Sequence, residues 1–450
     1  MALTTIMLAA TSSGQQTSLT VGEAVNQALA KYPAVRSSLE QVSAAAAGIG
    51  LARTAYLPRA DALWEANRAT HNNIFGMMIA QPVISPISGP AQYTNSLQSV
   101  WGSAVGTLVQ WEPFDFGLRG ATVNLAAVTR DRAAAQVDVT KLQVAAAAAD
   151  GFLTILAAQE TVVAANAAVE RARVLNQTVQ VLVTNQLRPG ADAARTRSEL
   201  ALAETQFIRA QQSVDVSKAA LGQLLGVSGQ SLSVQSGPLL RPPPEPVPAA
   251  FDPGRHPQAV AQTQALNIVR SRESILNHSY YPRFYLQGTS YARGTGLRGD
   301  GSVGGAFSGF YPNIQNWGLG MTVTFPLFDF ASIRERKKIE VYNERTESAH
   351  YDQIIQDLNG QMEQARATLA AARKVAQNTP IQLQAARESE QQANARYKAG
   401  LGNIVEVAEA QRILAQAEID DALARLGVWR ALLAVDIAAG DVQPFLSQAK

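Results

Sequence analysis

The chain has 450 residues, no cysteine, and a formal net charge of +2 from 38 basic and 36 acidic side chains. The absence of cysteine excludes a disulfide framework, a cysteine-ligated metal site and a thiol nucleophile. The near balance of charge argues against a dedicated nucleic-acid-binding protein, which normally carries a basic face. Hydrophobic residues make up 47% of the chain, yet its mean hydropathy is only −0.04, because much of the apolar fraction is alanine.

Residues 1–18 are interpreted as a signal-peptide remnant or a disordered start. A short apolar run at 2–10 is followed by a Thr-Ser-Ser sequence, and no positively charged segment precedes it. No later segment has the ~18–20 unbroken apolar residues of a membrane-spanning helix. The alanine-rich stretch at 144–149, for example, ends at Asp150.

The chain contains an internal duplication. Pro33 and Pro58 flank a helix-like stretch in the first half, and Pro257 and Pro282 flank another in the second half with the same spacing. Further landmarks recur in the same order: Phe114-Asp115-Phe116 as Phe328-Asp329-Phe330, Ala203-Glu204 as Ala417-Glu418, and Leu225-Gly226 as Ala439-Gly440. Agreement of several landmarks in one order indicates two structural repeats.

The duplication predicts the domain organisation. The first structural repeat covers 19–236, the second covers 252–450, and a proline-rich linker at 237–251 joins them. The linker is expected to be extended, because proline cannot continue a helix. The first repeat opens with a helix, for which Thr20 and Glu23 form a predicted capping box.

Each repeat is predicted to contain two strands joined by a long loop. The strands are placed at about 59–69 and 100–113 in the first repeat, and at about 283–292 and 316–328 in the second. The alternation is clearest at 317–325, where large apolar residues alternate with glycine and threonine. A half-buried strand of a soluble sandwich would have the same pattern. A length of ~9–11 residues also suits a tilted strand that crosses a bilayer.

Very long helices follow the strands. The segment 121–186 has no proline, and 332–399 has only Pro380. Small and apolar residues recur there every seven positions, which is coiled-coil spacing. A glycine-containing turn then leads to a second helix in each repeat, at about 192–225 and 404–439. The prediction is a mainly α fold with a small β part, built from duplicated helix-strand-strand-long helix-helix units.

This order of elements, with Pro33, Pro58, Phe114-Asp115-Phe116-Gly117 and their counterparts in the second repeat, resembles the outer membrane efflux protein (TolC-like) family. The resemblance implies a homotrimer in outer membrane lipid, with a twelve-stranded β-barrel continued by an α-helical coiled-coil tunnel in the periplasm. It implies passive export in a tripartite efflux or type I secretion system, with a periplasmic adaptor (membrane fusion) protein and an inner-membrane pump as partners. Four strands per subunit agree with sharing, because a closed barrel needs about eight.

The resemblance also places a pore aperture at the helix turns. The stretch 397–409 resembles the periplasmic tip of the family, where acidic residues form cation-selective rings. Glu406 and Glu409 lie at i and i+3 on one helical face. Threefold symmetry would gather six carboxylates around one axis, where each would raise the pKa of the others. Without the resemblance, the two are solvated glutamates that the nearby helix N-terminus favours.

Other residues at the turns and junctions are assigned as follows. Tyr397 matches a family position that helps to hold the aperture shut, but Gly402 stands where the family has the arginine partner. Asp192, at the first turn, is a weaker pore candidate, with a plain helix N-cap as the equal alternative. Asp115 and Asp329 are predicted to cap helices where strand becomes helix.

No feature of the sequence indicates chemistry. The four histidines share no metal-ligand spacing, and no nucleophile–base pair stands out. The glycine-rich segment 299–305 lacks the Lys-Ser/Thr and the helix of a phosphate-binding loop. We therefore expect no catalytic residue, no metal, no cofactor, no enzymatic activity and no nucleic-acid partner. The alternative to a channel is a soluble coiled-coil scaffold or stalk protein without channel activity.

Overall fold

The computed structural model describes residues 18–73, 82–84, 90–93, 95–229, 232–244 and 251–450. The predicted signal-peptide remnant lies outside the described residues, apart from Ser18. The chain divides into two compact units, each built from segments of both predicted repeats. Unit 1 comprises Met1–Val42, Arg132–Gln264 and Ser348–Lys450, and unit 2 comprises Ser43–Asp131 and Ala265–Glu347.

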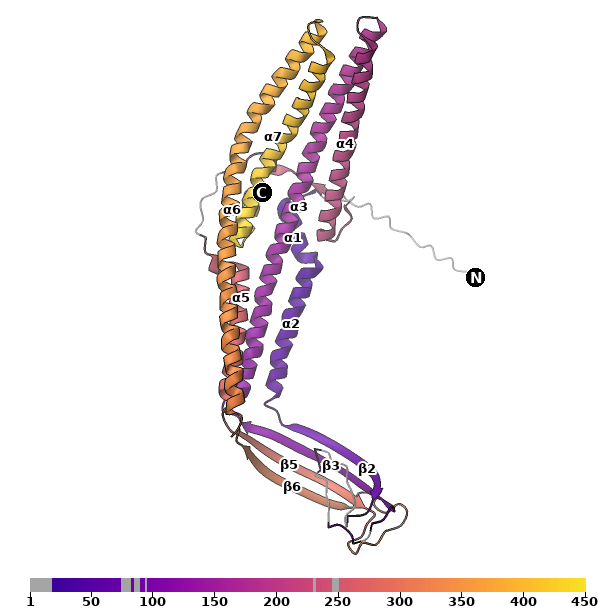
Figure 1. The fold of residues 1–450 in the computed structure, drawn as a ribbon, viewed down its shortest axis with the longest axis vertical. Coiled ribbons are helices and arrows are strands. Elements are labelled where there is room, and N and C mark those ends of the chain that lie inside the picture. The colour runs from indigo at the N-terminus through magenta and orange to yellow at the C-terminus, as the bar shows by residue number, and fades with distance from the viewer. Residues whose placement is uncertain (1–17, 74–81, 85–89, 94, 230–231, 245–250) are drawn as a thin grey trace, which may run out of the picture. The chain divides into compact units, whose positions relative to one another are not determined.

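Unit 2 contains a four-stranded antiparallel sheet with the order β2-β3-β5-β6 (Figure 1). The strands are β2 (Arg59–Thr70), β3 (Ser99–Phe114), β5 (Arg283–Thr295) and β6 (Ile314–Thr324). Each predicted repeat supplies one hairpin, and the central β3–β5 pair joins the two. The predicted strands are confirmed within a few residues, except that the last one ends at Thr324 rather than at 328. Pro326, two residues after Thr324, lacks the N–H that would continue the ladder.

The two faces of this sheet differ in chemistry. The strand register places large apolar side chains on one face, here called the apolar face, and they are exposed: Trp64 70%, Trp317 82%, Leu319 73% and Met321 70%. The opposite face, here called the small-residue face, carries several glycines and polar residues: Gly102, Ala104, Gly106, Gln110, Gln287, Asn316, Gly318 and Gly320. An exposed apolar surface of this kind marks a contact with a membrane or with another protein.

Helices make up most of the chain, in agreement with the predicted fold class. The two longest, α3 and α6, have 67 and 69 residues, which corresponds to about 100 Å each. Residues of α2, α3, α5 and α6 belong to both units. The helices are α1 (Val21–Lys31), α2 (Pro33–Thr54), α3 (Leu118–Thr184), α4 (Gly190–Leu225), α5 (Pro257–His278), α6 (Phe330–Lys398), α7 (Ile404–Ala439) and α8 (Gln443–Gln448).

The start of the chain follows the sequence prediction in part. The predicted capping box is confirmed, since the Thr20 side chain accepts from the Glu23 N–H and Glu23 bonds back to the Thr20 N–H. The prediction that the first repeat opens with one continuous helix is wrong, because α1 and α2 are separated at Tyr32. Tyr32 is extended, as expected for a residue that precedes a proline, here Pro33.

The linker also differs from the prediction. Its first residues form a 3-10 turn, Gly237–Leu240, rather than an extended chain. Pro238 lies in the first turn, where a missing N–H has no cost. Just before it, β4 (Ser233–Val234) pairs in parallel with β1 (Ser18–Leu19), a contact that the sequence did not predict.

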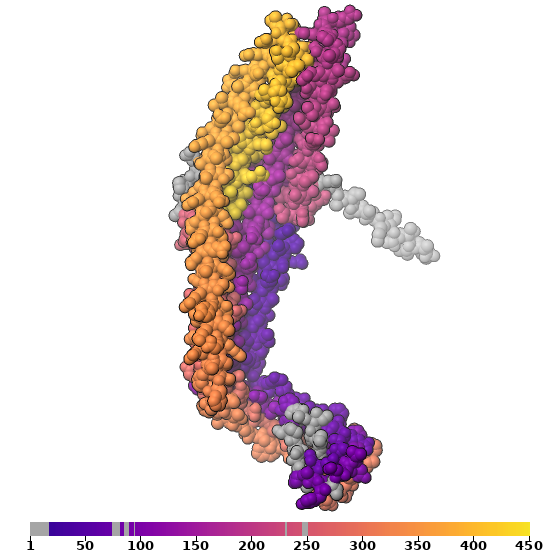
Figure 2. Space-filling view, in the orientation of Figure 1, coloured from indigo at the N-terminus to yellow at the C-terminus, as the bar shows by residue number. Residues whose placement is uncertain are grey.

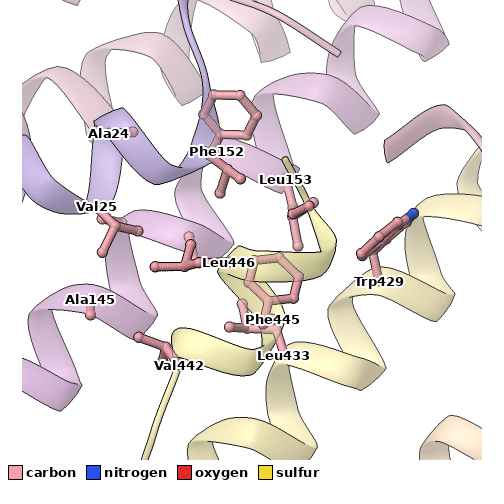
Figure 3. Packing of buried hydrophobic residues seen from close by; sticks show 14 of the residues in the cluster. Ala24, Val25, Ala145, Phe152, Leu153, Trp429, Leu433, Val442, Phe445 and Leu446 are labelled. Atoms are coloured by element: carbon pink, nitrogen blue, oxygen red, sulfur yellow. The ribbon is translucent and has the colours of Figure 1, made fainter. Parts of the chain in front are cut away.

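The core of unit 1 surrounds the short C-terminal helix α8 (Figure 3). Phe445 is fully buried and packs edge-to-face against Trp429, at 6.0 Å between ring centroids. The Trp429 indole donates to the carbonyl of Arg241 at 2.7 Å, which ties the linker to α7. Among the described residues, α3 alone is long and apolar enough to cross a membrane by length and composition. It contributes the fully buried Phe152 to this core.

Candidate functional site

The turns of the two helical hairpins meet in unit 1. The turn between α3 and α4 and the turn between α6 and α7 are held together by one buried apolar cluster. Figure 2 shows the hairpin ends of α6–α7 (yellow) and α3–α4 (magenta) packed side by side. The buried members of the cluster are Leu175, Val179, Ala193, Tyr397, Ile404 and Val407.

Tyr397 is the centre of this contact and is 1% exposed. Its hydroxyl donates to Asp192 Oδ2 at 3.3 Å. The Arg188 guanidinium lies over its ring, 4.5 Å from the centroid, and Arg188 Nη2 donates to the Tyr397 carbonyl at 2.9 Å. Burial, assisted by the negative charge of Asp192, raises the pKa of the Tyr397 hydroxyl. Two predicted site residues, Tyr397 and Asp192, are therefore in direct contact.

The N-cap alternative for Asp192 is wrong. Helix α4 begins at Gly190, two residues before the predicted start, with Pro189 at the N-cap position. Asp192 therefore lies inside the first turn of α4. Its carboxylate accepts a hydrogen bond from Tyr397, which belongs to the α6–α7 hairpin.

Arg188 is a residue that the sequence reasoning missed. The sequence did contain a signal for it. Position 402, where the family has an arginine, is glycine, and Arg188 lies in the other turn, between α3 and α4. A side chain at Gly402 would lie 3.3 Å from Glu406 Oε2 and 3.4 Å from Arg396 Cβ. The nearest of these atoms belongs to an exposed glutamate side chain that can move aside, so packing alone does not require glycine at 402. Arg188 brings a guanidinium to Tyr397 from the opposite turn.

Glu406 and Glu409 are both exposed near the start of α7. Asn403 caps this helix: its Oδ1 accepts from the Glu406 N–H at 2.9 Å, and its Nδ2 donates to Glu406 Oε1 at 3.3 Å. Glu409 accepts two hydrogen bonds from Arg412, at 2.6 and 2.9 Å. These bonds lower the pKa of Glu409 within one subunit, which is opposite to the rise expected from carboxylates alone. Within one subunit, Glu406 is therefore bonded to the neutral Asn403 side chain, whereas Glu409 is paired with the cation Arg412.

The strand–helix junction lies in unit 2. Asp115 is buried, and its carboxylate accepts from the N–H of Gly117 at 3.2 Å and from the N–H and Nε of Arg119 at 2.6 and 2.9 Å. Burial raises the pKa of Asp115, but these bonds outweigh it and the net pKa is lowered. The predicted capping role of Asp115 is confirmed. Asp329 precedes α6 and contributes its backbone carbonyl, which accepts from the Ile333 N–H at 2.8 Å.

No metal site is found within the described part of the chain, where no three His, Asp or Glu side chains are grouped to hold an ion. The described contacts at the turns are hydrogen bonds, an arginine–ring contact and apolar packing. Such an arrangement can hold two hairpins together and present charge.

Comparisons with known proteins agree with this architecture. VceC, an outer membrane protein of Vibrio cholerae, is 15% identical with a TM-score of 0.70, over 94% of this chain and 96% of that one. The CmeC outer membrane channel of Campylobacter jejuni is 15% identical with a TM-score of 0.72, over 95% and 89%. A membrane protein from Pseudomonas aeruginosa is 18% identical with a TM-score of 0.76, over 93% and 92%. At these identities the likeness shows the fold.

The family is shown by sequence. No curated protein matches the chain. The model of the outer membrane efflux protein family, however, matches residues 24–227 and 255–441, which together form most of the chain. The chain therefore belongs to the outer membrane efflux protein family and is an export channel of the outer membrane.

Proposed function

We propose that three copies of this chain close a twelve-stranded barrel in outer membrane lipid, continued by a periplasmic tunnel of α-helices. The observation that carries the proposal is the open four-stranded sheet with an exposed apolar face. Within the described strands, β2 and β6 each have one neighbour only. In hydrocarbon an unpaired backbone group costs several kcal/mol, so each outer edge has to pair with that of a neighbouring copy.

The duct is passive and works with other components of an export system. The fold family consists of channels, and the described residues offer charge and packing at the turns rather than a catalytic group. Energy and substrate capture therefore come from an inner-membrane pump and a periplasmic adaptor protein, in a tripartite efflux or type I secretion system. Neither a cofactor nor an enzymatic step belongs to this proposal.

The helix turns form the pore aperture in this proposal. Asp192 and Arg188 contact Tyr397 across the two hairpins, so these contacts resist separation of the turns. Glu406 and Glu409 lie exposed beside them. Three copies would place a ring of Glu406 carboxylates near the axis, with Glu409 partly neutralised by Arg412. The ring selects for cations, because closely spaced carboxylates produce a strong local negative potential.

Planar-bilayer recordings test the proposal with a charge-matched control. Glu406→Gln removes one negative charge per subunit and should lower cation selectivity and block by multivalent cations. The double variant Glu409→Gln with Arg412→Gln removes a bonded pair and leaves the net charge unchanged, so its selectivity should stay near that of the wild type. Equal selectivity in all three proteins would reject the ring. A chain that stays soluble without detergent and is monomeric by light scattering would reject the channel.

A further inference from the structure

A short segment of the long β2–β3 connection lies on the small-residue face of the sheet. Within unit 2, Ile84 is 2% exposed, Val83 is 9% exposed, and both pack with Ala104, which is 0% exposed. Three partly buried apolar side chains complete the cluster: Leu63, Leu108 and Tyr291. The segment 82–84 thus covers a defined place on the sheet.

The strand register shows that the sheet surface under Val83 and Ile84 is suited to apolar side chains. Leu63, Gly106 and Tyr291 are consecutive partners across β2, β3 and β5, and Ala104 is in the neighbouring row. A side chain at Gly106 would collide with Tyr291. Ala104 and Gly106, which are small, therefore form the bottom of a shallow apolar site on the sheet, and larger apolar side chains surround it.

The surroundings of the cluster are polar. Glu65 and Arg293 flank Ala104 in its own row of the ladder. Farther along the same face, Gln110 and Gln287 are partners. The apolar cluster is therefore a local patch on a polar face, and the described part of the β2–β3 connection supplies the Val83 and Ile84 side chains that cover it.

We propose that residues 82–84 form an internal plug that narrows the barrel lumen near the loop end of the sheet. The inference rests on the proposed barrel, whose lumen the small-residue face would line. Three copies would place three such plugs in one cross-section. The plug is a second constriction, made by side chains other than those at the helix turns, and it limits the size of exported molecules.

Cysteine accessibility tests whether the segment is docked, because the chain has no native cysteine. Ala104→Cys should react slowly with a water-soluble maleimide added to intact cells. Adding Ile84→Asp should remove this protection, since a carboxylate is disfavoured in an apolar cluster. Leu97→Asp is the matched control, because Leu97 belongs to the same connection and is 95% exposed. Equal reactivity of Ala104→Cys in all three backgrounds would overturn the docking.

Passage through the lumen tests whether the docked segment obstructs it. Gln287→Cys lies on the same face, farther from the loop end. In intact cells a bulky maleimide–polyethylene glycol should label Gln287→Cys only when Ile84→Asp is also present, whereas a small maleimide should label it in every background. Labelling of the Gln287→Cys protein by the bulky reagent in the absence of Ile84→Asp would overturn the plug. Failure of the parent to form a trimer or to conduct in bilayers would instead reject the barrel itself.

Discussion

Asp436 gives the sharpest prediction about stability. It lies in the last turn of α7, and its Oδ2 is buried with no partner among the described residues. Burial raises the pKa of this carboxyl to about 6, and the nearby Asp441 adds to the rise, while a bond from the Phe445 N–H opposes it. A negative charge near a helix C-terminus is also unfavourable.

The sign of the pH dependence follows from this rise. An aspartate in the unfolded chain has a pKa near 3.8, so the folded state binds more protons between about pH 4 and pH 6. The free energy of unfolding therefore falls as the pH rises through this window, and the loss is complete above it. A rise of two pKa units corresponds to about 3 kcal/mol. Because the side chain is only half-buried, we reduce this to about 1–2 kcal/mol.

Asp436→Asn removes the titration. The variant should be more stable than the wild type by about 1–2 kcal/mol at pH 7.5 and equal to it near pH 4. Denaturant unfolding in detergent, followed by helical circular dichroism at both pH values, measures the difference. The control is Asp215→Asn, an exposed aspartate of α4, which should change stability little at either pH. A variant that is less stable at pH 7.5, or equally changed at both pH values, would refute the reasoning.

Three further predictions concern packing, capping and the aperture. Phe445→Ala should destabilise unit 1 by about 3–5 kcal/mol in the same unfolding assay, and a loss below 1 kcal/mol would contradict the core position of α8. Thr20→Ala should cost about 1 kcal/mol through loss of the capping box, whereas Thr20→Ser should retain stability. Arg188→Ala should raise the open probability in planar bilayers more than Tyr397→Phe does, because Tyr397→Phe keeps the ring and the carbonyl that Arg188 contacts. The reverse order would argue against a role of the Arg188–Tyr397 contact in holding the turns together.

The sequence predicted the elements whose signals are local. The period-two alternation at 317–325 identified β6, and the long runs without proline identified α3 and α6. The boundaries at Tyr32 and Thr324 were missed, although Pro33 and Pro326 supplied the signal. Backbone restrictions by proline act over one or two residues, so a pattern read over a longer window overlooks them.

Contacts between distant segments were outside the reach of sequence reasoning. Strands β1 and β4 have two residues each, and each is recognisable as a strand only through its pairing with the other. Docking of Ile84 on Ala104 and of Arg188 on Tyr397 likewise joins residues that are far apart or in different hairpins. Asp192 was predicted as a weaker pore candidate with a helix N-cap as the alternative, and its contact with Tyr397 could not be predicted from its place after the turn.

The open edges of β2 and β6 constrain how the protein reaches its final place. A lone subunit that entered the bilayer would carry two rows of unbonded peptide groups into hydrocarbon, which is energetically prohibitive. In the aqueous compartment the same edges, beside exposed Trp317 and Trp64, are sites for aggregation. In the proposed trimer, insertion into the bilayer therefore has to coincide with the pairing of these edges between the three copies.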